Sequence, residues 1–210
     1  MKYIFMIGAP GSKWSSVSKN IYYSPDIDRT DYSDARTYYH HDSWGTMQLM
    51  HMGAYFDPGM EFGGFFDEID CYTKEQCEAE FDRPFTGTGV RIIKSHVVAH
   101  NIDFLKDHWP ESPIVLVQRP DDACLDQWVK SGHFTITYPK YDQYYQNLRT
   151  MSQMISAQNR AIQAAVWRYK GHIVNTNTEL AKALNIQPPP AKYEQNYGVG
   201  ANADIRVTVI

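Results

Sequence analysis

The feature of this sequence that most constrains its fold is a short apolar run followed at once by a glycine loop. Residues Tyr3 to Gly8 are almost entirely apolar, and they lead through Gly8-Ala9-Pro10-Gly11-Ser12-Lys13-Trp14-Ser15-Ser16 into a predicted helix over Ser15 to Ile21. Glycines let backbone N–H groups turn inward, and a helix N-terminus adds positive potential, so with Lys13 the loop favours phosphate binding. The alternative is a tight strand-to-helix turn with a solvated lysine.

Three further runs rich in Ile, Val and Leu predict strands of the same sheet: Val90 to Val98, Ile114 to Gln118 and His172 to Asn175. Their apolar residues are continuous rather than alternating, which is typical of parallel strands covered on both faces. The long segments between them leave room for crossover helices. The sequence therefore predicts an α/β fold of three layers, with helices flanking a central, mainly parallel sheet.

The helices between these strands are predicted from periodicity and capping signals. The clearest one spans about Tyr144 to Tyr169, where apolar residues recur at helical spacing. Shorter helices are predicted over Asp103 to His108, Asp121 to Lys130 and Thr178 to Leu184. The last of these is expected to be capped by Asn177 or Thr178.

The predicted strand over Val90 to Val98 carries Lys94 and His96 near its carboxyl end. Open α/β sheets bind ligands at the carboxyl ends of their strands, so we expect His96 to face the same crevice as the glycine loop. Imidazole titrates near neutrality and can take a proton from a hydroxyl nucleophile within hydrogen-bond reach. His96 is therefore a candidate general base, and the alternative is a hydrogen-bonded core histidine.

The strand over Ile114 to Gln118 runs into Arg119, which is followed by Pro120, Asp121 and Asp122. Proline and acidic residues are typical of the first turn of a helix. An arginine fork binds phosphate in bidentate fashion, which suits a second phosphate group on the same nucleotide. The alternative for Arg119 is an ion pair with Asp121 or Asp122.

Together these features resemble the sulfotransferases that use 3′-phosphoadenosine 5′-phosphosulfate (PAPS) as donor, a superfamily with a P-loop-type fold. Gly11-Ser12-Lys13-Trp14 resembles the GTTW of the family's 5′-phosphosulfate loop, and Lys94-Ser95-His96 is similar to its KTH strand end. Val117-Gln118-Arg119-Pro120-Asp121 resembles the start of its VxRNPxDxxxS motif. The resemblance covers about Lys2 to Trp14 and Val90 to Ser131, and is nearest to short sulfotransferase-like proteins of bacterial viruses.

The resemblance implies a role for each matching residue. His96 would be the general base, while Lys13 and Lys94 would stabilise the leaving group. The family lysine would fall on Ala9, so Lys13 replaces it from another position. The 5′-phosphate would be bound by Pro10, Gly11, Ser12, Lys13, Trp14 and Ser15. Arg119 would anchor the 3′-phosphate with Gln127, which stands at the place of the family serine, or with Ser131, and no metal is implied.

Charge and cysteine content exclude several functional classes. A formal charge of −4 argues against broad binding of nucleic acid. No apolar run approaches the roughly 20 residues of a membrane-spanning helix, and Met1 to Pro10 lack the basic segment and the small-residue cleavage site that are typical of a signal peptide. Cys71, Cys77 and Cys124 form no CxxC pair, which is typical of free thiols in a reducing compartment. We therefore expect a cytoplasmic protein, in the host cytoplasm if viral, without nucleic-acid or membrane partners.

At 210 residues the chain suits a single domain over residues 1–210. Residues 22–88 are rich in Tyr, Phe, His and Gly, and predict an insertion that lines the site of a small-molecule or carbohydrate acceptor. The alternatives are irregular packing without a functional role, or a self-association surface of a homodimer. The residues considered for that pocket are Tyr22, Tyr23, Tyr38, Tyr39, His40, His41, Asp42, Tyr55, Phe56 and Phe62. Residues 187–210 are predicted to form an arm that carries a last edge strand over Arg206 to Ile210.

Two other functions stay open at this point. A kinase with a degenerate P-loop would place Lys13 on the phosphates of ATP and Ser15 or Ser16 near Mg²⁺. The sequence lacks the glycine before Lys13 and an obvious strand-end aspartate for the metal. A non-catalytic binding or virion-associated protein would keep the fold without turnover.

Overall fold

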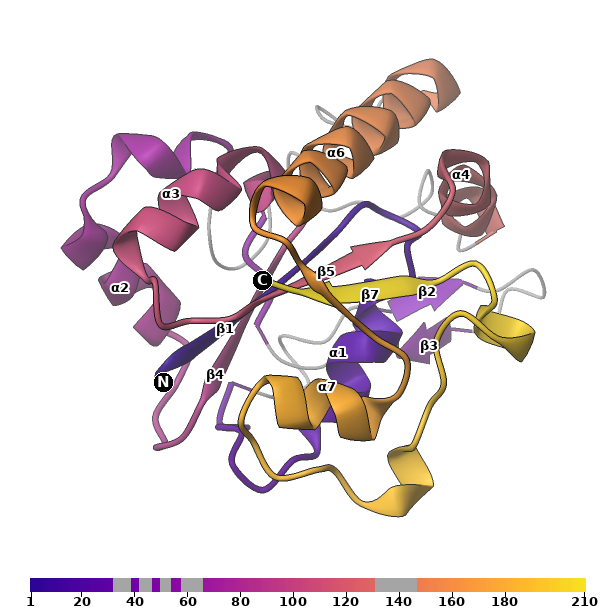
Figure 1. Cartoon of the computed structure of the whole chain (residues 1–210). Helices are drawn as coiled ribbons and strands as arrows, with labels where there is room; N and C mark the ends of the chain where they lie inside the picture. The colour runs from indigo at the N-terminus through magenta and orange to yellow at the C-terminus, as the bar shows by residue number, and fades with distance from the viewer. Residues whose placement is uncertain (32–38, 42–46, 50–53, 58–65, 131–146) are drawn as a thin grey trace.

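The computed structural model describes residues 1–31, 39–41, 47–49, 54–57, 66–130 and 147–210 (Figure 1). Its main feature is a five-stranded sheet with the strand order β4-β1-β5-β7-β6. These strands are β1 Tyr3–Gly8, β4 Arg91–Ser95, β5 Ile114–Gln118, β6 His172–Val174 and β7 Arg206–Val209. A separate antiparallel pair joins β2 Tyr39–His41 to β3 Met47–Leu49.

Helices connect the strands and cover the sheet. The α-helices are α1 Trp14–Tyr22, α2 Lys74–Asp82, α3 Ile102–His108, α4 Asp121–Lys130, α6 Leu148–Arg168 and α7 Asn177–Ala183. Short 3₁₀ helices are η2 Phe66–Cys71, η3 Val97–Asn101, η4 Ala191–Tyr193 and η5 Gly200–Asn202.

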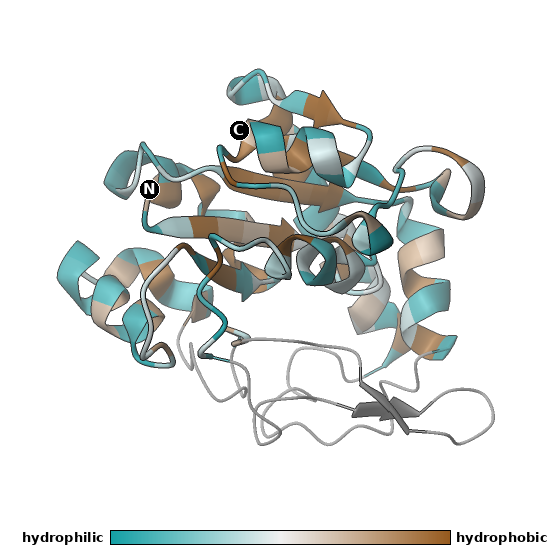
Figure 2. Ribbon diagram, turned by 90° about the horizontal axis from the view of Figure 1, so that it is seen from below, coloured by the Kyte–Doolittle hydropathy of each residue, from teal (hydrophilic) through white to brown (hydrophobic). Residues whose placement is uncertain are grey.

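Strand β1 lies inside the sheet and is buried at every residue. Its alternate side chains enter two different hydrophobic clusters. Phe5 packs with residues of α2, α3 and α6, whereas Met6 packs with residues of α1 and α7. Figure 2 shows the strands mostly in brown, the colour of hydrophobic residues, and much of the helical surface in teal. Helices therefore cover both faces of the sheet, which confirms the predicted α/β fold and explains the continuous apolar runs.

Both neighbours of β1 run parallel to it. Ile7 pairs with Ser95 of β4, and Gly8 pairs with Val117 of β5. The carboxyl ends of these three strands therefore meet at one edge of the sheet. The glycine loop, His96 and Arg119 all follow directly at that edge.

Strand β7 corrects the prediction of a C-terminal edge strand. It lies between β5 and β6 and runs antiparallel to both, so the sheet is mixed. Val207 and Thr208 are completely buried, and backbone hydrogen bonds join Ile114 and Ile210 in both directions at 2.9 and 3.0 Å. An apolar strand of this kind is stabilised by neighbours on both sides, but its place in the strand order depends on contacts distant in sequence.

Two helix starts differ from the prediction. Helix α7 is capped by Thr176, whose hydroxyl accepts a hydrogen bond from the Glu179 N–H at 3.0 Å, and not by Asn177 or Thr178. Helix α2 was not predicted, although Thr73 and Gln76 form a complete capping box at its start. Both starts follow the rule that a side-chain oxygen satisfies an otherwise unpaired N–H of the first turn.

The predicted insertion at residues 22–88 returns to the edge of the sheet at two described points. Ile27 forms an isolated bridge with Val90, and Tyr55 forms one with Lys94. Much of the insertion lies outside the described residues, and the single-domain organisation stays a prediction. Among the helices in the described ranges, none combines the length and apolarity that a membrane crossing requires.

The buried hydroxyl of Thr208 gives a test of the packing around β7. Its Oγ1 has no hydrogen-bond partner within the described part of the chain. We expect Thr208→Val to raise the free energy of unfolding by about 1 kcal/mol, because a methyl group replaces an unsatisfied buried hydroxyl. Urea denaturation would measure the change. Thr208→Ser keeps the hydroxyl and should destabilise the protein, and a loss of stability in Thr208→Val would contradict the account.

Candidate functional site

The glycine loop begins with a tight turn over Ala9 to Ser12. The Ser12 N–H donates to the Ala9 carbonyl at 3.0 Å, and Gly11 has a φ of 78°. Proline at the second position and a residue with positive φ at the third are the signature of a type II turn. The sequence Ala-Pro-Gly-Ser therefore determines this turn locally.

Gly11 is also required by the packing of the loop against α4. A Cβ atom at this position would lie 1.9 Å from the carbonyl oxygen of Cys124. Ala9 packs in the same region, in a hydrophobic cluster with Cys124 and Trp128 of α4 and Ile155 of α6. The loop is therefore held directly against α4, which begins just after Arg119.

Lys13 connects this turn to α1 and has an unusual backbone conformation. Its φ of 63° is in the left-handed region, and no side-chain hydrogen bond caps the helix that starts at Trp14. A lysine in this conformation costs about 1 kcal/mol, and such strain is frequent at functional sites. The Lys13 Nζ lies 3.4 Å from the Ala201 carbonyl oxygen of the C-terminal arm.

His96 packs against the glycine loop from the end of β4. Its Nδ1 contacts the Gly8 carbonyl oxygen, and its ring centroid lies 4.2 Å from that of Trp14. Because a carbonyl oxygen can only accept, Nδ1 carries the hydrogen and Nε2 keeps its lone pair. Burial lowers the pKa of His96 to about 3. The imidazole is therefore neutral at physiological pH, with Nε2 as its basic atom.

Asp57 binds the chain where β4 ends and His96 begins, a role that was not predicted from the sequence. One of its carboxylate oxygens accepts from the Ser95 hydroxyl at 2.6 Å and from the His96 N–H at 2.9 Å. Burial raises the pKa of Asp57 to about 6, although these hydrogen bonds act in the opposite direction. The carboxylate fixes the backbone from which the imidazole projects.

Lys94 is buried on β4, with only 2% of the residue exposed. Burial lowers its pKa to about 8, while the charge of Asp31 raises it. The lysine is thus mostly protonated at neutral pH. It supplies a positive charge two residues before His96.

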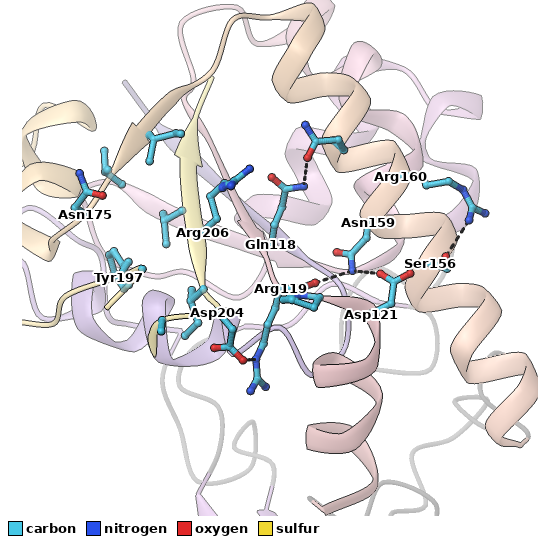
Figure 3. A pocket seen from close by; sticks show the side chains of 18 residues that line it. Gln118, Arg119, Asp121, Ser156, Asn159, Arg160, Asn175, Tyr197, Asp204 and Arg206 are labelled. Carbon is cyan, nitrogen blue, oxygen red and sulfur yellow. Dashed lines mark hydrogen bonds and ion pairs between the residues drawn. The ribbon is translucent and has the colours of Figure 1, made fainter. Parts of the chain in front are cut away.

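Arg119 contacts the loop from the other side, at the end of β5. Its Nη1 donates to the carbonyl oxygens of Gly11 and Ala123, both at 3.2 Å. Its Nε pairs with Asp204 at 2.6 Å (Figure 3). The alternative of an ion pair with Asp121 or Asp122 is therefore replaced by a pair with a residue of the C-terminal arm.

The other residues predicted to bind the nucleotide or the acceptor differ in how far they are buried. Pro10, Ser12 and Trp14 are buried, and the Ser12 hydroxyl has no partner among the described residues. Ser15 is half-buried in the first turn of α1, and Gln127 is half-buried in α4. Ser131 lies outside the described residues. Of the aromatic residues considered for an acceptor pocket, Tyr22, Tyr55 and Phe56 belong to the hydrophobic core, and Tyr55 also contacts the rings of Trp14 and His96.

No family model, curated protein or solved structure matches this chain. In the described ranges, no group of three or more His, Cys, Asp and Glu side chains is placed to hold a metal ion. The chemistry of the site is therefore interpreted from its own geometry. That geometry joins Lys13, His96 and Arg119 around one loop.

The close contact between Gly11 and α4 can be tested by substitution. Gly11→Ala should lower the free energy of unfolding by about 3 kcal/mol or more, because it combines a positive φ with a backbone clash. Gly198→Ala is a matched control, since Gly198 has a φ of 73° and the nearest atom to its Cβ would be 3.9 Å away. The control should lose only about 1 kcal/mol in the same denaturation assay. Equal losses of unfolding free energy in the two variants would show that Gly11 does not lie in close contact with the backbone of α4.

The burial of His96 predicts a pH dependence of stability. Its pKa is lower in the folded than in the unfolded state, so the unfolded state gains the proton first as the pH falls below about 6.5. Between pH 7 and pH 5 this histidine should reduce the free energy of unfolding by about 2 kcal/mol. His96→Gln keeps a hydrogen-bond donor for Gly8 but cannot take up a proton. Between pH 7 and pH 5, its free energy of unfolding should therefore fall by about 2 kcal/mol less than that of the unmodified protein. Asp57 has a raised pKa, so its protonation stabilises the fold as the pH falls, equally in both proteins. If the free energies of unfolding of the two proteins changed by the same amount over this range, the lowered pKa of His96 would be contradicted.

Proposed function

We propose that the glycine loop binds an adenosine nucleotide phosphorylated at both the 3′ and 5′ positions, and that the chain is a PAPS-dependent sulfotransferase with a P-loop-type fold. One observation carries the proposal. Groups from three neighbouring parallel strands meet at this loop: Lys13 after β1, His96 after β4 and Arg119 after β5. Convergence of cations and a base at the carboxyl edge of parallel strands is typical of a ligand site in α/β folds.

The donor set fits a ligand with two separate phosphate groups. Lys13 and the N-terminus of α1 form one positive region, and Arg119 forms a second on the other side of Gly11. The Arg119 guanidinium is paired with the Asp204 carboxylate, a group that resembles a phosphate in charge and hydrogen bonding. A bound 3′-phosphate would replace Asp204 as the partner of this fork.

His96 supplies the proton acceptor in this proposal. Its Nδ1–H bond to Gly8 orients the ring, so Nε2 can accept the proton of an acceptor hydroxyl or amine group. PAPS would supply the sulfuryl group, whose S–O bond to the 5′-phosphate breaks as the acceptor oxygen or nitrogen attacks sulfur. The negative charge of the donor near His96 would raise the pKa of the imidazole above its ligand-free value, which strengthens the base when the donor is present.

Lys13 and Lys94 would stabilise the negative charge that builds on the leaving phosphate. Lys94 is buried and stays mostly protonated, so its charge acts in surroundings of low dielectric constant. Lys13 is closer to solvent and held by its strained backbone at the start of α1. The acceptor in this proposal is a small molecule or carbohydrate with a free hydroxyl or amine.

A second candidate function is nucleotide binding without transfer. The observation that favours it is the burial of His96, which is 2% exposed and has a strongly lowered pKa. A buried, neutral histidine could equally serve only as a structural contact to the Gly8 carbonyl. Conversion of PAPS to its bisphosphate in the presence of acceptors separates the two functions, because only a transferase gives turnover.

Calorimetric titration with 3′-phosphoadenosine 5′-phosphate tests the donor site directly. We expect this bisphosphate to bind and Mg-ATP not to bind. Arg119→Ala should weaken binding tenfold to a hundredfold, since it removes charge-assisted hydrogen bonds worth about 1.5–3 kcal/mol. Asp204→Asn should tighten binding severalfold, because it removes the carboxylate that competes for Arg119.

Arg168→Ala is the control for this titration. Arg168 lies at the end of α6 and pairs with Asp103, so its loss should leave bisphosphate affinity unchanged. Absence of bisphosphate binding would reject the proposal, and binding of Mg-ATP in its place would indicate a kinase. Equal binding by the Arg119 variant would reject the role of this arginine.

A further inference from the structure

Residues 198–204 of the C-terminal arm form a short loop between two buried anchors, and we call this loop the strap. Tyr197 before it and Ile205 after it are each 2% exposed and belong to one hydrophobic cluster. Every residue of the strap itself is half-buried or exposed, and Val199 is 57% exposed. Figure 1 shows its 3₁₀ turn η5 projecting beside the start of β7. The strap is therefore fixed at its ends and loosely packed between them.

The conformation of the strap depends on its own backbone. Hydrogen bonds of 2.9 to 3.2 Å within the turn are donated by the N–H groups of Gly198, Asn202, Ala203 and Ile205. Gly198 and Gly200 have φ angles of 73° and 56°, in the left-handed region that glycine adopts without penalty. A Cβ atom on Gly200 would meet no atom within 4 Å. Glycine is thus required there by the backbone angle and not by a contact.

Two polar contacts join the strap to the candidate site. The Lys13 Nζ donates to the Ala201 carbonyl at 3.4 Å, and the Arg119 Nε pairs with the Asp204 carboxylate at 2.6 Å (Figure 3). Lys13 and Arg119 are the cations assigned above to the two phosphate groups of the ligand. One short segment of the arm therefore contacts both proposed phosphate positions at the same time.

The position of Asp204 on Arg119 makes the strap a competitor of an anion and not a cover over it. The Arg119 Nη1 donates to the carbonyl oxygens of Gly11 and Ala123, both at 3.2 Å. A bidentate anion uses two neighbouring N–H groups of the guanidinium, so the edge that includes Nε is the one that remains. Asp204 already occupies this edge. A phosphate that binds Arg119 in this way has to displace the strap.

Building on the proposed function, we propose that the strap is an internal competitor of the ligand and has to open before both phosphate groups bind. Asp204 belongs to the same chain, so it competes at every protein concentration. The apparent dissociation constant is then the intrinsic one divided by the fraction of molecules with an open strap. Loose packing between two buried anchors allows this opening to be local, without unfolding of the sheet.

Hydrogen exchange of the full chain, measured by mass spectrometry on peptides that cover residues 198–205, tests the proposal. Saturation with 3′-phosphoadenosine 5′-phosphate should speed exchange in the strap about threefold or more, because the bound ligand shifts the population to the open state. Asp204→Asn should speed it in the ligand-free protein. Asp103→Asn is the matched control, since it removes the carboxylate of the exposed pair with Arg168, and it should leave exchange in the strap unchanged.

Gly200→Ala tests the competition by calorimetry, at a residue that contacts no group of the site. Alanine disfavours the left-handed backbone angle of the closed strap, so the variant should bind the bisphosphate up to about fivefold more tightly than the unmodified protein. Asp103→Asn should bind it with unchanged affinity. Unchanged or weaker binding by Gly200→Ala would overturn the proposal, and so would slower exchange in the strap on ligand binding, which is the result for a cover that closes.

Failure of the proposed function gives a different result. If the bisphosphate binds neither the unmodified protein nor the variants, sodium phosphate at about 50 mM replaces it, compared with sodium chloride of equal ionic strength, to reach sites of millimolar affinity. Faster exchange in the strap with phosphate than with chloride would reject the nucleotide but support the internal competitor. Equal exchange rates in the two salts would overturn the proposal.

Discussion

The carbonyl oxygens of Gly8 and Gly11 are the points at which three strands of the sheet are joined at one edge. His96 donates to the first from the end of β4, and Arg119 donates to the second from the end of β5. These contacts depend on the parallel pairing of β1 with both neighbours, because only that pairing brings the three carboxyl ends together. They also depend on the absence of a side chain at Gly11, since a Cβ there would collide with α4. The arrangement of the candidate site therefore follows from the packing of one short loop.

The C-terminal arm belongs to this arrangement because of where β7 lies. As an inner strand between β5 and β6, it brings the residues that precede it to the same edge of the sheet. Ala201 then accepts a contact from Lys13, and Asp204 pairs with Arg119. Lys13 of the loop and Arg119 after β5 thus both have partners in one short segment of the arm. In the proposed function, an anionic ligand exchanges with Asp204, which couples ligand binding to the position of this segment.

The elements with strong local signals could be predicted from the sequence. The strands Tyr3–Gly8 and Ile114–Gln118 and the helix Asp121–Lys130 agree with the prediction residue for residue, since continuous apolar runs and a Pro-Asp-Asp start determine them locally. The rule that open α/β sheets bind ligands at the carboxyl ends of their strands also predicted that His96 and Arg119 lie at the same edge of the sheet. What could not be predicted involves partners distant in sequence. Asp204 is 85 residues from Arg119, and the inner position of β7 depends on two strands that precede it. The sulfotransferase assignment itself stays a prediction.

The most direct test of the central claim is a crystal structure of the chain with 3′-phosphoadenosine 5′-phosphate. The account predicts the 5′-phosphate at the start of α1 near Lys13, and the 3′-phosphate on the Arg119 guanidinium with Asp204 displaced from it. It also predicts that His96 keeps its Nδ1 on Gly8 and turns Nε2 toward the region beside the 5′-phosphate. A nucleotide bound elsewhere, or an intact Arg119–Asp204 pair beside an ordered nucleotide, would contradict the claim that this loop is the donor site.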